Sequence, residues 1–449
     1  MLFKLRIRNF KSIRDSRDIK LKPLTIFVGP NSSGKSSILE SIWFLSLATK
    51  KSESNFFGIL SEYFSKLYNT HKYPVELISF RRDKNNWISF ELYLKPKEET
   101  KRLLLGIFPK IGSIQTIGYG FSYLPKEDNY RHWLCINEEV IADVTYDVRK
   151  SVNGVTKIPK ILKPDGFSNF TPKGTLSRIL NRDAFYFEPR SHKPITTEQR
   201  ELAEKIKNIA HIIIDEITQI LSNTYLLTAI RGAIALETTE AKPEWVGMKG
   251  EDLLRLLALC FSRREYTHKA EKIEKWAKRF GISKLKAGWT GEREKLGADF
   301  EDPKLKVPIE LALAGHGSRQ ALVIITQLIW SEPGSVILIE EPEISLHPEQ
   351  QLAMMELFIE AINEGKQIIC TTHSPIFILS LGYVVGEGIL DSPEEKVAIY
   401  HVEKKENGTE IKLLKLNEYG FIMGWIPGYL EVERKLFSRW VDSLEAKKP

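Results

Sequence analysis

The sequence predicts an α/β fold with a mixed or antiparallel β lobe and a helical insertion, and three observations carry this prediction. Short apolar runs at 24–28, 335–339 and 367–371 have the length of buried strands, and segments of helical character accompany them. Residues 74–160 contain further strand-like runs separated by turn signals, as an antiparallel sheet does. Residues 197–222 have helical periodicity.

Length and composition narrow the class of protein. The chain has 449 residues, enough for two to four domains of about 100–200 residues each. No stretch approaches the ~18 apolar residues of a membrane span, and the N-terminus lacks the apolar core of a secretory signal. Cys135, Cys260 and Cys370 lack metal-ligand spacing and fit a reducing compartment. We therefore expect a cytoplasmic protein with no membrane partner.

The first 22 residues carry most of the net charge of +7, with eight basic and two acidic side chains. In Leu2–Phe10, apolar residues alternate with Lys4, Arg6 and Arg8, which predicts a half-buried strand with a basic outer face. Such a face can bind DNA. A solvated sheet face is the alternative interpretation.

Turn signals and periodicity place the other elements. Asn153-Gly154 and Asn407-Gly408 predict hairpins, and Asp83–Asn86 predicts a third between two strand-like runs. Helices are expected at about 36–47, 197–222, 250–264, 268–280, 318–330 and 348–363. The predicted units are an N-terminal lobe at 1–195, a mainly helical insertion at 196–300 and a C-terminal lobe at 301–449.

The strongest motif is G-x-x-x-x-G-K-S, which follows the strand at 24–28 and opens a helix. Its glycines let backbone N–H groups point at phosphate oxygens, and the helix N-terminus favours an anion. Lys35 would reach the β- and γ-phosphates, and Ser36 would ligate Mg²⁺. The residues expected to bind ATP are Gly29, Pro30, Asn31, Ser32, Ser33, Gly34, Lys35, Ser36 and Ser37.

A second buried strand ends in Glu340-Glu341-Pro342-Glu343. A phosphate-binding loop needs a carboxylate at the end of a neighbouring strand to hold Mg²⁺, and Glu340 is expected in that role. Glu341 would orient and deprotonate the attacking water. The alternative is a capped helix start, because proline and acidic residues favour a helix N-terminus.

Two further segments suggest contacts with phosphate. His373 follows an apolar strand and could contact a γ-phosphate, although a structural or capping role is the alternative. Residues 313–320 place two glycines and a serine before a helix, which is either a second anion site or an ordinary helix start. Two anion sites in one chain suggest a dimer in which each chain closes over the nucleotide of the other.

Together these segments resemble the ABC-type ATPase heads of the SMC, RecF and OLD-like group, whose domains are often classed as AAA-like. The run LRIRNFKSIRD to ILESI resembles their N-terminal lobe, LIEEPEISLHPEQQ their Walker B motif and D-loop, and TTHSP their H-loop. LNEYGFIMGWIPGYL resembles the tails of a subset. The clear match covers about 1–50 and 305–430. It implies a P-loop NTPase of ABC type, with a nucleotide sandwich in which Gly317 and Ser318 act in trans.

The chain departs from the pattern of this group in several places. The metal ligand is commonly Asp but here is Glu340, and AGHGSRQ differs from the usual LSGGQ-like signature. Lys35 and Ser318 are only 283 positions apart, so long coiled-coil arms are not expected. OLD-type nucleases carry a Toprim domain with an Asp-x-Asp motif, which is missing after Pro375, so no intrinsic nuclease is expected.

The predicted function is Mg²⁺-dependent ATP binding and hydrolysis that drives assembly of a homodimer or higher homo-oligomer, in DNA maintenance or anti-phage defence. The alternative is a slow-turnover, ATP-dependent scaffold or sensor that controls a separate nuclease or other effector. A transporter subunit is disfavoured, because the long β-rich region and the run IEEPEISLHP look unlike transport cassettes.

Overall fold

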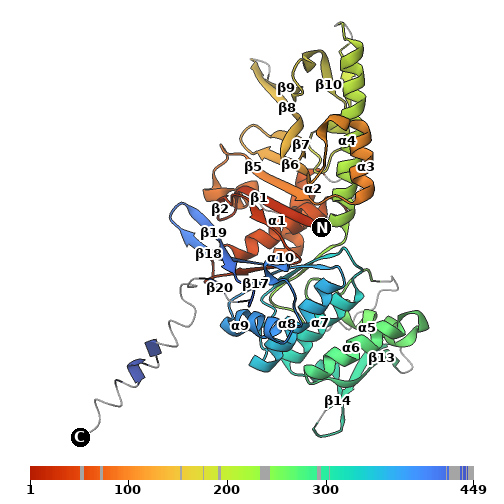
Figure 1. Cartoon of the computed structure of the whole chain (residues 1–449), viewed down its shortest axis with the longest axis vertical. Helices are drawn as coiled ribbons and strands as arrows, with labels where there is room; N and C mark the ends of the chain where they lie inside the picture. The colour runs from red at the N-terminus through yellow and green to blue at the C-terminus, as the bar shows by residue number, and fades with distance from the viewer. Residues whose placement is uncertain are drawn as a thin grey trace.

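Two sheets lie one above the other along the long axis of the molecule, with a helical layer below them (Figure 1). The computed structural model describes residues 1–50, 55–70, 74–151, 154–174, 176–190, 194–232, 243–290, 295–302, 304–420, 422–423, 435–436, 438–440 and 442.

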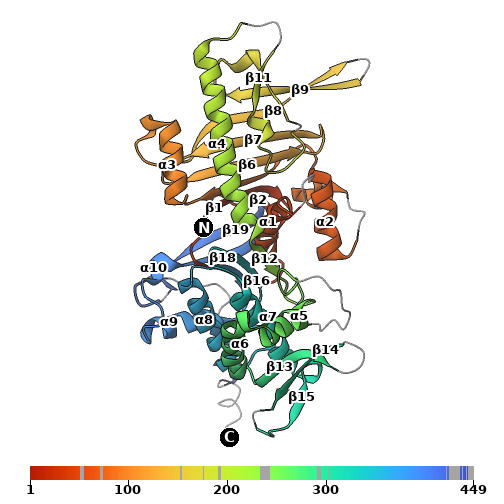
Figure 2. The ribbon, with the colours of Figure 1, turned by 90° about the vertical axis from the view of Figure 1, so that its right-hand side faces the viewer.

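The upper sheet is antiparallel, with the order β2-β1-β5-β6-β7-β8-β9 and β3 paired to β1. Its strands are β1 (Leu2–Phe10), β2 (Ile13–Asp15), β3 (Ile19–Lys20), β5 (Ile88–Leu94), β6 (Ile117–Leu124), β7 (Asn129–Ile136), β8 (Glu139–Ser151) and β9 (Gly154–Lys163). The long helix α4 (Thr197–Ser222) runs along one face of this sheet (Figure 2). A capping box between Thr196 and Gln199 starts α4, and a row of buried isoleucines faces the sheet.

The lower sheet is mainly parallel and positions the functional site. Its order is β12-β16-β17-β4-β18-β19-β20, with parallel pairing from β12 to β18. The strands are β12 (Thr224–Leu227), β16 (Val336–Glu340), β17 (Gln367–Thr372), β4 (Leu24–Val28), β18 (Val397–Lys405), β19 (Gly408–Leu416) and β20 (Ile422–Met423). Strands β4, β16 and β17 are almost wholly buried, as expected for a sheet covered on both faces.

Two hydrophobic clusters cover the faces of this parallel sheet. Helix α1 (Lys35–Leu47) belongs to the cluster that continues into the upper sheet. Helices α7 (His316–Trp330), α8 (Pro348–Asn363) and α9 (Pro375–Gly386) belong to the cluster on the other face. This second cluster also contains α5 (Leu253–Ser262), α6 (Thr267–Arg279), β13 (Ser283–Thr290) and β14 (Lys295–Glu301).

The remaining elements are short or lie at the periphery. They are α2 (Phe56–Tyr68), α3 (Glu98–Ile107), α10 (Pro393–Lys396), β10 (Phe170–Pro172), β11 (Phe187–Pro189) and β15 (Pro308–Glu310). Single turns of 3-10 helix are η1 (Val75–Leu77), η2 (Phe80–Arg82), η3 (Pro109–Ile111), η4 (Phe167–Asn169), η5 (Asp183–Phe185), η6 (Arg264–Tyr266) and η7 (Leu311–Leu313).

The predicted α/β fold is confirmed, with local corrections. The hairpin predicted around Asp83–Asn86 is wrong, because residues 75–82 form 3-10 turns and only β5 follows as a strand. Helices α2 and α3 were not predicted. Asn153 lies outside the described residues, whereas Asn407-Gly408 does join β18 to β19. Within the described ranges the longest helix is α4, with 26 residues, so no long coiled coil is present there.

Segment 196–300, expected as an insertion, divides between the two lobes. Helix α4 packs in the hydrophobic cluster of the upper sheet, and β12 pairs with β16 in the parallel sheet. Helices α5 and α6 pack against α7 instead. A search of the described helices finds none long and apolar enough to cross a bilayer.

Candidate nucleotide site

The P-loop joins β4 to α1, as the motif predicts. Lys35 is only 5% exposed, and its Nζ atom donates to the carbonyls of Gly29 (2.9 Å) and Pro30 (2.8 Å). Burial lowers the pKa of Lys35 to about 8, although three nearby carboxylates oppose this shift. Pro30, Asn31, Ser32 and Ser36 are exposed, whereas Gly29, Ser33 and Ser37 are buried. The loop therefore offers a cation and an open rim to a phosphate group.

The terminal hairpin and the N-terminal lobe hold the P-loop in shape. Gly34 has a φ of 106°, and a Cβ there would lie 2.4 Å from the Thr409 hydroxyl. Only glycine fits this position without strain. The Thr409 hydroxyl donates to the carbonyl of Ser33 (2.9 Å) and lies 2.8 Å from the Ser12 hydroxyl. These contacts hold the backbone of the loop at Ser33 and Gly34.

Ser36 and Glu340, the residues predicted to hold Mg²⁺, contact each other in the structure. The Ser36 hydroxyl hydrogen-bonds to the Glu340 carboxylate, which also accepts a hydrogen bond from the backbone N–H of Ala229 (3.2 Å). Burial raises the pKa of Glu340. A hydroxyl and a carboxylate are the hard oxygen ligands that Mg²⁺ prefers. Ser33 adds a buried hydroxyl without a hydrogen-bond partner inside the loop. These residues fit Mg²⁺ with a bound phosphate.

Glu341 and His373 come together at the ends of adjacent strands. The Oε1 atom of Glu341 lies 3.2 Å from Nε2 of His373. The hydrogen bond to His373 is the main reason that the pKa of Glu341 falls below its ordinary value. Glu341 has a φ of 43°, an uncommon left-handed conformation, and its N–H donates to the Thr371 carbonyl (3.0 Å). Strained backbone of this kind is often found at active sites.

Sequence reasoning did not assign a role to Glu343, which secures the His373 segment. Its Oε1 atom accepts from the Thr372 hydroxyl and from the His373 N–H, both at 2.7 Å. Glu343 was read only as part of the acidic run after β16. The pairing of β16 with β17 brings this run beside residues 371–373.

Arg231 is a second residue of this site that sequence reasoning missed. Its guanidinium is buried behind the Glu340–Glu341 turn and donates to the carbonyls of both glutamates, at 2.7 and 2.9 Å. Burial lowers the pKa of Arg231 to about 10. No motif contains this arginine, and only the pairing of β12 with β16 places it at the site.

The residues predicted to act in trans lie at the start of α7. The Ser318 hydroxyl donates to the carbonyl of Phe280 (2.6 Å), within the same lobe. A Cβ on Gly317 would lie 2.3 Å from the carbonyl oxygen of Ser345, so this glycine permits close packing against the D-loop segment. The action of Gly317 and Ser318 on the nucleotide of a second chain stays a prediction.

The basic face of β1 is paired with carboxylates. Lys4 contacts Asp18 (3.2 Å) and Glu138 (2.8 Å). Arg6 contacts Asp15 at 3.0 Å, and Arg8 contacts Glu91 at 3.2 Å. These ion pairs offset much of the positive charge that the sequence concentrates on this strand.

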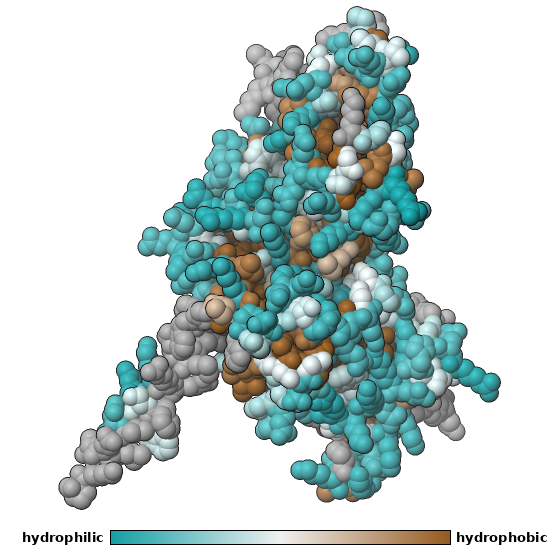
Figure 3. All heavy atoms as spheres, viewed as in Figure 1, coloured by the Kyte–Doolittle hydropathy of each residue, from teal (hydrophilic) through white to brown (hydrophobic). Residues whose placement is uncertain are grey.

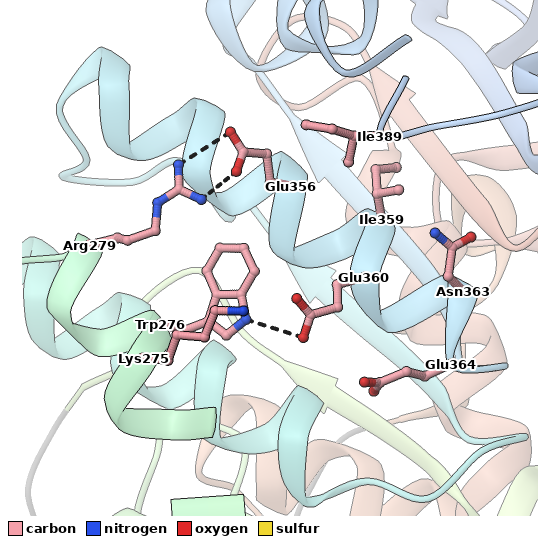
Figure 4. Close-up of a pocket in the computed structure, with 9 residues that line it drawn as sticks. All are labelled: Lys275, Trp276, Arg279, Glu356, Ile359, Glu360, Asn363, Glu364 and Ile389. Carbon is pink, nitrogen blue, oxygen red and sulfur yellow. Dashed lines mark hydrogen bonds and ion pairs between the residues drawn. The ribbon is translucent and has the colours of Figure 1, made fainter. Parts of the chain in front are cut away.

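A separate hollow of about 480 Å³ lies between α6 and α8 (Figure 4). Its acidic side chains have partners within the protein: Glu356 pairs with Arg279, Glu360 with Trp276 and Lys272, and Glu364 with Lys272. This arrangement gives no reason to place a phosphate in the hollow.

A strand–loop–helix with a buried lysine, together with carboxylates at the end of a neighbouring parallel strand, defines a P-loop nucleotide-binding domain. The chain belongs to the AAA ATPase domain family, which matches residues 1–378.

Two curated proteins are similar to this chain. An OLD nuclease of Thermus scotoductus is 24% identical over 397 residues, and the match covers 84% of this chain but 60% of that protein. The chain thus spans well under two thirds of the length of that relative. An ATP/GTP phosphatase of Helicobacter pylori is 23% identical over 392 residues, covering 86% of this chain and 89% of that protein.

Solved structures with a similar arrangement include SMC head domains. The head from Pyrococcus yayanosii has a TM-score of 0.45 at 12% identity and covers 93% of this chain and 98% of that one. The head from Thermotoga maritima has a TM-score of 0.40 at 12% identity and covers 92% and 99%.

Proposed function

We propose that this protein binds ATP with Mg²⁺ and hydrolyses it. One observation carries the proposal: Lys35, the Ser36–Glu340 pair and the Glu341–His373 pair all lie at the same ends of β4, β16 and β17. These strands are parallel neighbours, and ligands of open α/β sheets bind at the carboxyl ends of such strands. Membership of the AAA ATPase domain family supports the same activity.

Each side chain has a role in this proposal. Lys35 binds the β- and γ-phosphates through its ammonium, which has three N–H donors and uses two of them on the loop carbonyls. Ser36 and Glu340 hold Mg²⁺, which supplies charge neutralisation on the phosphates. Glu341 accepts the proton of the attacking water, and His373 holds the Glu341 carboxylate in place.

The direct test is phosphate release by the purified protein with ATP, measured with Mg²⁺ and again with excess EDTA. Mg²⁺-dependent release is expected. A protein that binds ATP and releases no phosphate under any tested condition would contradict the proposal and favour the scaffold described below.

A second copy of the chain is the proposed partner in the ATP-bound state. Ile230, just before Arg231, is 80% exposed, and Leu313, just before the signature segment, is 76% exposed. In this proposal a second chain covers these two side chains. Association through this surface would bring α7 of one chain to the P-loop of the other.

The second candidate is a slow-turnover scaffold that controls a separate nuclease. One observation favours it: the similar Thermus protein is a longer chain named as a nuclease. A role in DNA maintenance or defence rests on that name and remains part of the proposal. Slow hydrolysis with tight ATP retention, measured by single-turnover kinetics, would favour this candidate over rapid cycling.

DNA is also a proposed partner, with less support than a second copy of the chain. Because Lys4, Arg6 and Arg8 are paired with carboxylates, we expect any DNA affinity to be modest and steeply salt-dependent. Fluorescence anisotropy with a duplex at low and high salt tests this expectation, and salt-insensitive binding would contradict it.

A further inference from the structure

Arg231 is a buried arginine behind the two carboxylates of the site. It is 3% exposed and lies four residues after the end of β12. Strand β12 pairs in parallel with β16, with Leu227 opposite Ile339. This register places the residues that follow β12 level with Glu340 and Glu341. Arg231 therefore places a positively charged guanidinium behind the Glu340–Glu341 turn, which carries the proposed metal ligand and base.

The guanidinium bonds to the backbone of this turn. Nη1 of Arg231 donates to the carbonyls of Glu340 (2.7 Å) and Thr228 (2.9 Å), and Nη2 donates to the carbonyl of Glu341 (2.9 Å). The pairing of β16 with β17 ends at Glu340, so carbonyls beyond that point need other donors. A planar guanidinium can reach two neighbouring carbonyls at once, whereas the single ammonium of a lysine has no such fork.

The segment that contains Arg231 also packs on α7, the helix that begins within the signature-like run AGHGSRQ. The N–H of Gly232 donates to the carbonyl of Lys249 (2.8 Å). A Cβ on Gly232 would lie 3.2 Å from the backbone nitrogen of Gln320 and 3.3 Å from the carbonyl carbon of Arg319, at the start of α7. The backbone that follows Arg231 is thus held against helix α7. This contact limits how far the Arg231 side chain can move.

We propose that Arg231 is a positioning residue for ATP hydrolysis: it fixes the Glu340–Glu341 turn and thereby keeps the Glu341 carboxylate on His373. The left-handed backbone of Glu341 needs such support, because strained conformations persist only where the surrounding structure holds them. Arg231 lies behind the turn and makes its contacts through main-chain oxygens. The proposed effect of Arg231 on ATP hydrolysis rests on the proposed role of Glu341 as the base.

The test compares Arg231→Lys with a matched control, Arg131→Lys. Arg131 is a paired arginine on β7, bonded through two nitrogens to Asp143, and β7 belongs to the upper sheet rather than the nucleotide site. For Arg231→Lys we expect a fall in kcat of about 10- to 100-fold, since small misplacement of a catalytic group has this effect. The affinity for a fluorescent ATP analogue should change by less than about 3-fold, because the P-loop is untouched. Arg131→Lys should leave both quantities at the wild-type level.

Amide hydrogen exchange supplies a readout that does not depend on turnover. In wild type the Glu341 N–H is bonded to the Thr371 carbonyl, and Arg231→Lys should speed exchange in peptides that cover 340–344. Arg131→Lys should leave the exchange of these peptides unchanged. Where Arg231→Lys does not fold, Arg231→Gln serves in its place.

The possible outcomes distinguish failure of the proposed ATPase function from failure of the proposed role of Arg231. Wild-type protein without ATP hydrolysis overturns the proposed function, and the exchange measurement still tests the support of the turn. An active wild type with an equally active and equally protected Arg231→Lys overturns the role of Arg231 alone.

Discussion

The Glu341 carboxylate lies 3.2 Å from Nε2 of His373, although 32 positions separate the two residues in the chain. The contact joins the ends of the neighbouring strands β16 and β17. It lowers the pKa of Glu341, so the carboxylate is ionised at neutral pH, as a glutamate of ordinary pKa also is. The contact also fixes the direction of a side chain whose backbone is already constrained to a left-handed conformation. The fixed direction of the side chain prepares Glu341 for the proposed catalytic role, whereas the lowered pKa makes the carboxylate a weaker base.

Replacing Lys35 by alanine should impair nucleotide binding. The variant loses the ammonium that lies within the P-loop, and a hydrogen bond to a charged group contributes roughly 1.5–3 kcal/mol. We therefore expect the Kd for a fluorescent ATP analogue to rise at least ~10-fold, measured by titration. Thermal unfolding of the ligand-free protein is the control for folding. Unchanged affinity and unchanged hydrolysis would show that Gly29–Ser36 is not the phosphate site.

Introducing a charge at Leu313 should prevent ATP-dependent association. Leu313→Glu places a carboxylate on the exposed surface beside the signature segment, whereas Leu305→Glu makes the same change at a residue that is 73% exposed near β15. In a Glu341→Gln background with Mg²⁺ and ATP, light scattering should show a doubled mass for the Leu305 variant and a single-chain mass for the Leu313 variant. If the Leu313 and Leu305 variants have equal masses, the contact between the two chains lies elsewhere.

Two neighbouring glycines should differ in their tolerance of alanine. A methyl group on Gly317 would meet the carbonyl of Ser345 at 2.3 Å, whereas no atom lies within 4 Å of the same position on Gly315. Gly317→Ala should destabilise the fold by about 1–3 kcal/mol, the usual effect of overpacking, and Gly315→Ala should be close to neutral. Urea unfolding measures both. Equal stability of the two variants would mean that the signature helix does not pack tightly on the D-loop segment.

The buried His132 should make the protein less stable in mild acid. Its Nδ1 accepts from the Tyr119 hydroxyl (2.6 Å), its Nε2 donates to the Leu176 carbonyl (2.8 Å), and burial lowers its pKa to about 4. Between pH 6.5 and pH 4 the unfolded chain gains a proton here that the folded chain does not. The free energy of unfolding should therefore fall by about 1.4 kcal/mol per pH unit in this window from His132 alone.

His132→Gln removes this titration. Its free energy of unfolding, measured in urea at several pH values, should fall less steeply than that of wild type below pH 6.5 and run parallel to it above. Parallel curves throughout the range would show that His132 does not titrate differently in the two states.

The sequence alone placed most residues of the candidate phosphate site, and placed the fold around them less completely. Gly29–Ser36, Glu340, Glu341 and His373 could be placed because each lies at or just after the end of a short, mainly apolar run, and parallel strands carry their ligands at the same edge. Arg231 and Glu343 could not be assigned, since their contacts depend on strand register and on main-chain acceptors, neither of which leaves a motif.

The errors in the fold have a similar origin. The run at 75–80 has the composition of a strand, yet Ile78 is fully buried within 3-10 turns beside the N-terminal sheet. Tertiary packing overrides local propensity there. Helix α4 was predicted correctly from the helical periodicity of residues 197–222, and the structure adds the capping box at Thr196 and Gln199. The sequence analysis assigned α4 to an inserted unit because periodicity does not show which surface an apolar face covers, and in the structure this face packs in the cluster of the upper sheet.

The central claim is that Glu341 is the base for ATP hydrolysis, and the most direct measurement is phosphate release by Glu341→Gln. The glutamine keeps the shape of the side chain and can still bond to His373, while Lys35, Ser36 and Glu340 are unchanged. We predict that Mg²⁺-dependent binding of ATP stays within about 3-fold of wild type and that hydrolysis falls by ~10²–10⁴-fold, the usual contribution of a positioned base. A Glu341→Gln protein that binds ATP and releases phosphate at the wild-type rate would contradict the claim.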